Sequence, residues 1–246
     1  MMGFKNRLTT IIGATFAAAS LFAVTSAAQA NLSLRVIDGV TTIATINDGG
    51  AGDLNPLSGA VTFIGSFGAA ITNIDSGLSK PIIGSITAPE LHLDGLLASS
   101  GAISLTLMLS DTDFSGSLGD FFASIGGVLG GGLGSNITYS VYRDLTNTLF
   151  GTGAGTLVCS VGPLTASPFG GNCANTLGLD SNYSITLVAA LNHAGEGHSS
   201  FNAVAKDDVP VPEPSAMILI SIGMIGVAAW SKRKTMAEVK AVSKIR

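Results

Sequence analysis

The feature that most constrains the fold is a two-residue period of apolar side chains in the middle of the sequence. Between residues 103 and 109, Ile and Leu occupy every odd position, and Ser, Thr or Met the even ones. Ile185, Leu187 and Ala189 repeat this alternation. A period of two places alternate side chains on opposite faces of a β-strand. No long helical patterns separate the β-rich stretches, so we predict an all-β, antiparallel β-sandwich of jelly-roll-like form and exclude a parallel α/β sheet.

Turn residues divide the chain into short strands. Asp38-Gly39 lies between two β-rich runs, 32–36 and 40–46, and this dipeptide favours a hairpin whose turn needs a positive φ. Further strands are predicted at 59–67, 70–75, 85–94, 102–110, 136–144, 155–161, 183–192 and 199–206.

One segment favours a short helix instead. Ser117 and Asp120 have capping-box spacing, and the apolar residues between 118 and 129 recur at helical intervals. Five glycines between 126 and 132 weaken a helix, each by roughly 1 kcal/mol. We expect either one short helix or a glycine loop between two strands.

The first 30 residues are typical of an export leader. Lys5 and Arg7 precede an apolar stretch, and Ala28-Gln29-Ala30 supplies small residues at a signal peptidase site. We expect residues 1–30 to be a signal peptide that is cleaved after Ala30. An uncleaved membrane anchor is the alternative.

The last residues form a three-part tail. A proline-rich segment at 210–215 is expected to be stiff and extended, because proline fixes φ and restricts the residue before it. An apolar run, 216–231, follows and is just long enough for a transmembrane helix. Lys232, Arg233 and Lys234 form a stop-transfer basic cluster that begins a basic tail, 232–246, expected to stay in the cytoplasm.

The tail resembles the PEP-CTERM sorting signal of Gram-negative bacteria that make extracellular polysaccharide. The matching residues are Val211, Pro212, Glu213, Pro214 and Ser215, followed by the apolar span and the basic cluster. The resemblance implies that an exosortase cleaves near the motif, so that the preceding part moves from a transient inner-membrane anchor to the cell surface or matrix. A plain single-pass anchor after a proline linker is the alternative.

The segment between leader and tail, residues 31–209, has the length of one domain with its own core. It contains four basic and 14 acidic residues, a net charge of −10. Phosphate binding needs a basic face, so nucleic acid is excluded as a partner. Solubility outside the cell, or cation binding, fits this charge better.

Cys159 and Cys173 are the only cysteines of the chain, and both lie in the exported segment. An even pair in an oxidising compartment favours a disulfide that closes the loop between them. A metal site would need further ligands nearby, and the sequence supplies none.

Three groups of side chains were considered as sites. The polar stretch 47–55 offers oxygen ligands for calcium but lacks EF-hand spacing, which favours a plain loop. His193, Glu196 and His198 are zinc-ligand types, yet their glycine neighbours favour a hairpin turn. Asp111 and Asp113 follow a strand, and paired carboxylates are typical of calcium sites and glycosidases, but the sequence shows no partner at a suitable separation, which favours the absence of a site.

Other catalytic signals are absent from the sequence. His92 lies in a strand pattern, where a structural role is the commoner one. The glycine runs lack the endings of phosphate-binding and dinucleotide-binding loops, and no serine sits in a nucleophile elbow. We therefore expect no cofactor and no catalytic residues.

Three functions follow as hypotheses. The first is a non-enzymatic exported protein of the surface or matrix, associated with exopolysaccharide or biofilm. The second is a carbohydrate- or calcium-binding sandwich module, although the exported segment has three Tyr and no Trp for a sugar platform. The third is an extracellular hydrolase. The expected partners are signal peptidase, an exosortase-type enzyme and polysaccharide, with divalent cations bridging carboxylates such as Asp48, Asp53, Asp111 and Asp113.

Overall fold

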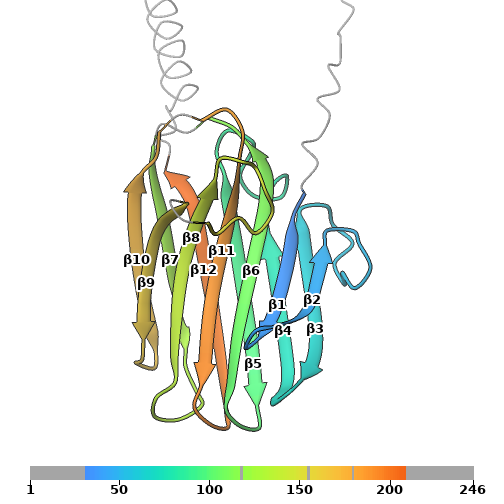
Figure 1. The fold of residues 1–246 in the computed structure, drawn as a ribbon, viewed down its shortest axis with the longest axis vertical. Helices are drawn as coiled ribbons and strands as arrows, with labels where there is room; N and C mark the ends of the chain where they lie inside the picture. Colours follow the sequence, from blue (N-terminus) through green and yellow to red (C-terminus); the bar gives the residue numbers. More distant parts are fainter. Residues whose placement is uncertain (1–30, 117–118, 154–155, 179, 209–246) are drawn as a thin grey trace, which may run out of the picture.

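A computed structural model describes residues 31–116, 119–153, 156–178 and 180–208 of the chain. In these residues the protein is all-β, with twelve strands in two six-stranded antiparallel sheets that face each other (Figure 1). The prediction of an antiparallel sandwich is confirmed. No helix in the described residues is long and apolar enough to cross a membrane.

The first sheet has the strand order β2-β1-β6-β11-β8-β9, and the second has β10-β7-β12-β5-β4-β3. The strand bounds are β1 Ser33–Asp38, β2 Thr41–Asn47, β3 Ala60–Phe67, β4 Ala70–Leu78, β5 Glu90–Ser99, β6 Ile103–Phe114, β7 Asp120–Val128, β8 Asn136–Asp144, β9 Leu157–Leu164, β10 Phe169–Thr176, β11 Tyr183–His193 and β12 Gly197–Asp208.

The last eight strands have jelly-roll topology. They pair as β5 with β12, β6 with β11, β7 with β10 and β8 with β9, so one long antiparallel ribbon winds alternately through the two sheets. Two local hairpins, β1–β2 and β3–β4, widen the two sheets on the same side. The predicted jelly-roll-like form is therefore present, with a hairpin added to each sheet.

The predicted first hairpin is present, with its two turn residues one position later than the Asp38-Gly39 dipeptide. Asp38 pairs with Thr41, which leaves Gly39 and Val40 as the two turn residues. Positive φ falls on Gly39 (59°), the first of the two, as in a type II′ turn rather than type I′. Gly39 is thus the residue that permits the tight connection.

The core lies between the sheets and follows the two-residue period. Leu105, Leu107 and Leu109 of β6 are buried, as are Ile185 and Leu187 of the neighbouring β11. Residues from both sheets join one hydrophobic cluster. Because one face of each sheet is apolar, neither sheet is stable without the other.

Two segments correct the sequence analysis. The expected helix or glycine loop is strand β7, whose Phe121, Ala123 and Ile125 alternate inward while Phe122 stays half-buried. Its glycines let the backbone of β12 approach closely. A Cβ on Gly127 would lie only 2.0 Å from the carbonyl oxygen of Ser200 in β12. Strand β10 was not predicted, because its residues are mostly small or polar and exposed.

The predicted strand at 85–94 is also misplaced. Strand β5 begins at Glu90, and the preceding residues form a turn in which the Ser85 amide donates to the Ala88 carbonyl. Pro89 follows this turn and ends the irregular stretch. The strand then runs five residues past the predicted boundary, to Ser99.

Cys159 of β9 and Cys173 of β10 form a disulfide, with their Cα atoms 5.9 Å apart. These are the edge strands of the two different sheets. The expected loop-closing pair therefore also ties the sheets together at one side of the sandwich. A bond in this place restrains the sheets where they have no further strand neighbour.

Strand β1 begins and β12 ends at the same end of the sandwich, which we call the terminal end (Figure 1). The long connections 48–59 and 79–89, and residues 145–153 of a third, lie at this end. At the opposite end the first two turns consist of residues 39–40 and 68–69. The terminal end therefore carries most of the irregular chain.

Several predicted features lie outside the described residues. These are the leader at 1–30, the sorting motif Val211 to Ser215, the apolar span 216–231 and the basic cluster Lys232, Arg233 and Lys234. They remain predictions from the sequence.

Candidate functional site: a polar hollow at the terminal end

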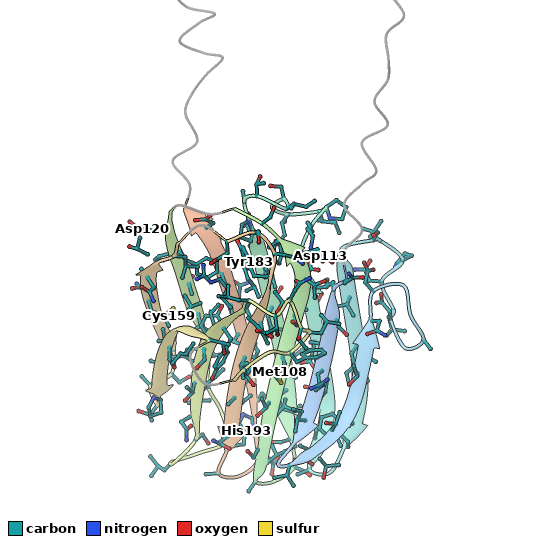
Figure 2. The ribbon with its side chains drawn as sticks, turned by 45° about the horizontal axis from the view of Figure 1, so that its top comes forward. Met108, Asp113, Asp120, Cys159, Tyr183 and His193 are labelled. Carbon is teal, nitrogen blue, oxygen red and sulfur yellow. A yellow bond between two sulfur atoms is a disulfide. The ribbon has the colours of Figure 1, made fainter. Side chains whose placement is uncertain are left out.

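A hollow of about 710 Å³ opens at the terminal end. It is surrounded by residues 31–32, the end of β6, the start of the β2–β3 connection and residues 147–149 of the β8–β9 connection. Most of its lining side chains are amides, hydroxyls or carboxylates; Asn31, Asn47, Asp48, Thr112, Asp113 and Asn147 are among them. Figure 2 shows Asp113 at this end of the molecule.

A β-bulge in β6 shapes the wall of the hollow. Asp111 pairs with Ile185 and Phe114 with Tyr183, so two residues of β6 stand opposite one residue of β11. Bulges of this kind redirect side chains near sites. Here Asp111 turns into the protein interior and Asp113 turns out toward the hollow.

Asp111 is fully buried and fully hydrogen-bonded. Its Oδ2 accepts from Ser79 Oγ at 2.6 Å and from Lys80 Nζ at 2.7 Å. Its Oδ1 accepts from the Thr112 amide at 2.8 Å and the Asn31 amide at 3.1 Å. Lys80 is itself only 1% exposed, so this is a buried ion pair with every carboxylate oxygen satisfied.

The ion pair joins the two sheets. Asp111 belongs to β6 of the first sheet, and Lys80 follows β4 of the second. The Lys80 ammonium also lies 4.1 Å from the centre of the Phe114 ring and donates to the Thr112 carbonyl at 2.5 Å. These contacts fix the two sheets to one another at the terminal end.

Asp113 is exposed and remains ionised. Its carboxylate accepts hydrogen bonds from Thr112 Oγ1, Asn147 Nδ2 and Asn31 Nδ2 at 2.7–2.8 Å. These bonds, that of Thr112 first, hold the pKa of Asp113 below its ordinary value. Asp113 and Asn147 have positive φ values of 62° and 57°, and the Asp113 amide donates back to Asn147 Oδ1.

The other acids that were predicted to bridge divalent cations are differently placed. Asp53 accepts backbone amides from Gly49, Asn55 and Thr62, so it organises its own loop. Asp48 accepts from the Gly59 amide and lines the hollow. Asp111 is buried against Lys80 and does not line the hollow, which corrects its assignment both as a bridging carboxylate and as half of a glycosidase pair.

The histidines do not converge on a metal. His193 is buried at the opposite end of the sandwich (Figure 2), and its Nδ1 and Nε2 each lie 2.6 Å from a serine, Ser99 and Ser199 respectively. Burial, and secondarily His198, lowers the pKa of His193. Glu196 and His198 are exposed. Within the described ranges, no three or more His, Cys, Asp or Glu side chains are grouped to hold a metal ion.

The turn that carries Glu196 also differs from the predicted hairpin. Its flanking strands, β11 and β12, belong to opposite sheets and do not pair with each other. The segment 194–196 therefore crosses the sandwich rather than closing a hairpin. His92 is half-buried on β5 and its Nε2 lies 2.9 Å from Glu90 Oε1, a local contact.

A second buried acid lies away from the hollow. Asp75 of β4 is 0% exposed, and the amide of Asn73 donates to one of its oxygens. The other carboxyl oxygen of Asp75 and the side-chain oxygen Oδ1 of Asn73 have no hydrogen-bond partner. Burial raises the pKa of Asp75 to about 8, so this side chain is protonated at neutral pH.

Sequence reasoning missed four residues of the terminal end: Asn31, Ser79, Lys80 and Asn147. Each stands more than 30 positions from its partner in β6. The one available signal was that Lys80 is among only four basic residues in the exported segment. A rare cation in an acidic domain is a candidate partner for a buried acid.

Comparison with known proteins gives a match to the tail. Residues 210–234 match the family described as "PEP-CTERM protein-sorting motif". Among curated proteins, no sequence matches this chain. A solved structure described as TmCBM61 in complex with beta-1,4-galactotriose is 8% identical, over 55% of this chain and 84% of that one, with a TM-score of 0.26. A likeness this slight carries no conclusion about this chain.

Proposed function

From the PEP-CTERM protein-sorting motif at residues 210–234, we propose that this chain is a non-enzymatic exported protein of the cell surface or extracellular matrix. The motif itself indicates export with membrane-anchored sorting in a Gram-negative bacterium, and it implies processing by exosortase. The finer proposal is that the released sandwich acts in the exopolysaccharide layer. The sorting motif is the single observation that carries it.

The placement of the motif supports this proposal. Strand β12 ends at Asp208, and the matched segment begins at residue 210. Cleavage within or after the motif therefore leaves every strand of the sandwich intact. The exported product then keeps both sheets, the disulfide and the buried ion pair.

Processing and location can be tested together in the native host. We expect surface material to contain a product that starts at Asn31 and ends near residue 214, measured by intact mass. Deleting the exosortase gene should leave the tail attached and the protein in the membrane fraction. Recovery of residues 232–246 on the mature surface protein contradicts the sorting proposal and supports a plain anchor.

The matrix role needs a separate measurement. Deleting the gene for this chain should change aggregation, matrix retention or surface properties and leave growth on defined carbon sources unchanged. Complementation with a chain that lacks 210–234 should not restore the phenotype. An unchanged matrix in the deletion strain contradicts the role even where processing is as expected.

Carbohydrate binding is the second candidate, and the lining of the hollow favours it. Amide, hydroxyl and carboxylate groups are the partners that sugar hydroxyls need, and the hollow has the volume of a small-molecule site. We expect Asn147→Gly, which keeps the positive φ at that position, to weaken binding of neutral oligosaccharides in calorimetric titration. The matched control is Asn175→Ala, outside the hollow. Equal binding by both variants contradicts this candidate.

A further inference from the structure

The first described residue, Asn31, is held by the cluster around Asp111. Its backbone nitrogen donates to Asp111 Oδ1 at 3.1 Å. Its side-chain amide donates to Thr112 Oγ1 at 3.0 Å and to Asp113 Oδ2 at 2.8 Å. Three hydrogen bonds therefore fix a residue that is otherwise exposed on the surface.

The charges around the Asn31 nitrogen are unbalanced. The carboxylate of Asp111 accepts from it, the carboxylate of Asp113 accepts from the side-chain amide of the same residue, and Asp48 of the β2–β3 connection lines the same hollow. The cation in contact with this group is Lys80, whose ammonium bonds Asp111. A positive charge at the Asn31 nitrogen would give this group of carboxylates a second cation, in direct contact with Asp111 Oδ1.

We propose that Asp111 is the receptor for the α-ammonium group of Asn31, which removal of the leader after Ala30 creates, while Asp113 holds the side chain of the same residue. Hydrolysis adds one water across the peptide bond between these residues, leaving a carboxylate on Ala30 and an ammonium on Asn31. The nitrogen that donated as a neutral amide in the precursor then donates as a cation to the same buried carboxylate. Charge-assisted hydrogen bonds are about twice as strong as neutral ones.

The proposal gives leader removal a structural effect. In the precursor the cluster binds a peptide N–H, and in the mature chain it binds an ion. Since Lys80 and Asp111 already join the two sheets, the new charge strengthens the place where the sandwich is fastened at its terminal end. This effect rests on cleavage after Ala30 and is independent of any ligand or matrix role.

The first experiment moves the ammonium while keeping the peptide N–H. Gly-Ser is inserted between Ala30 and Asn31 in the full chain, and the exported, processed protein is isolated. The control carries the same insertion between residues 208 and 209, at the other end of the domain. N-terminal sequencing verifies that each protein begins at the intended residue, and thermal unfolding is followed by circular dichroism from pH 6 to 10.

We expect the insertion before Asn31 to lower Tm by about 3 °C at pH 6.5 and the control insertion to leave it unchanged. The ammonium contributes stability below the α-amine pKa of the unfolded chain, about 8, and that contribution is lost as the amine deprotonates at higher pH. The difference in Tm between the unmodified protein and the protein with the insertion before Asn31 should therefore disappear by about pH 10. Asp75 titrates in this pH range in all three proteins, so its effect on Tm cancels when the proteins are compared at the same pH.

Two results of the unfolding experiment, and one of the N-terminal sequencing, overturn the proposal. One is an equal Tm at pH 6.5 for the unmodified protein and the protein with the insertion before Asn31. The other is a difference in Tm between these two proteins that stays constant from pH 6 to 10. A mature chain that begins at a residue other than Asn31 also overturns it. None of these outcomes depends on whether the protein reaches the matrix.

A second measurement needs no insertion. In the unfolded chain at pH 7, acetylation modifies an α-amine in preference to lysine, because the lysine pKa lies about 2.5 units higher, and the modified protein is then refolded. The acetylated Asn31 keeps its N–H donor and loses its charge, so its Tm should fall by the same few degrees. An unchanged Tm after complete acetylation contradicts the proposal.

Discussion

Asp111 and Asp75 are both completely buried, yet their surroundings differ. Asp111 accepts four hydrogen bonds, one of them from the ammonium of Lys80. Asp75 has a single donor, the amide of Asn73, and one of its oxygens has no partner. The two acids lie on facing sheets of the same sandwich, in β6 and β4.

The difference shows that burial alone does not decide what a carboxyl group does. At Asp111 a cation and aligned donors replace the water that burial removed. At Asp75 little replaces it, so the pKa rises to about 8 and the group keeps its proton at neutral pH. The first acid fastens the two sheets, and the second is a pH-dependent weakness in the core.

Removing the cation from Asp111 should have the largest effect. Lys80→Met leaves a buried carboxylate with no opposite charge, and we expect a loss of about 3–5 kcal/mol in the free energy of unfolding at pH 7. Urea unfolding followed by circular dichroism measures it. Lys206→Met, on the half-buried outer face of β12, is the control and should change the value by less than about 0.5 kcal/mol. Equal losses in both variants contradict the assigned role of the pair.

The opposite change at the second acid should stabilise the protein. The folded state keeps the Asp75 proton up to about pH 8, whereas the unfolded chain loses it near 3.8, so stability falls as pH rises between these values. Asp75→Asn removes this dependence. We expect a gain of about 3 kcal/mol at pH 8 and little difference at pH 3.5.

Urea titrations of both proteins at several pH values test this gain. The informative quantity is the difference between wild type and Asp75→Asn, because other groups titrate equally in both. A difference that does not grow between pH 4 and 8 contradicts the protonated, buried state of Asp75.

A smaller change removes one donor from Asp111 and leaves the ion pair. Ser79→Ala deletes the hydroxyl 2.6 Å from Asp111 Oδ2, and we expect a loss of about 1–2 kcal/mol. The control is Ser66→Ala, whose hydroxyl donates to the Ile71 carbonyl at the surface. If both variants lose the same free energy of unfolding, the hydrogen bond to the buried Asp111 stabilises the protein no more than a surface hydrogen bond does.

The smallest effect is expected at the exposed neighbour. The pKa of Asp113 is lowered in the folded state, so its stabilising contribution is present above the unfolded value of 3.8 and is lost as pH falls. Asp113→Asn should lower stability by less than about 1 kcal/mol at pH 7 and by nothing well below pH 3.8. This pH dependence has the opposite sign to that of Asp75, and finding the same sign in both variants contradicts the comparison.

The sequence was most informative where side chains alternate strongly. Strands β1, β6, β8 and β11 follow the two-residue period, and their pairing gives most of the first sheet. Strand β7 was misjudged because Phe121, Phe122 and Ile125 also fit a helical period. This segment is a strand because it pairs with β10 on one side and β12 on the other, and its glycines allow the close contacts that this pairing needs.

The site was less accessible to prediction. Asp111 was singled out, but its role depends on Lys80, which lies 31 residues away, directly after β4 of the other sheet. Likewise, nothing in the sequence around Asp75 shows that this acid faces the core, because β4 has Gly, Ser and Asn among its residues. Long-range pairing, which alternation does not encode, decides the state of both acids.

The position of β12 affects the order of folding. It is the last strand of the sandwich, yet it lies between β5 and β7 near the middle of the second sheet. In a chain exported from its N-terminus, this sheet stays divided until residue 208 has crossed the membrane, with β5 and β7 presenting unpaired edges. Pairing Glu90 with Lys206 is a contact of very long sequence separation, and such contacts form slowly. Folding of the domain therefore finishes only when the residues directly before the sorting motif have paired with β5 and β7.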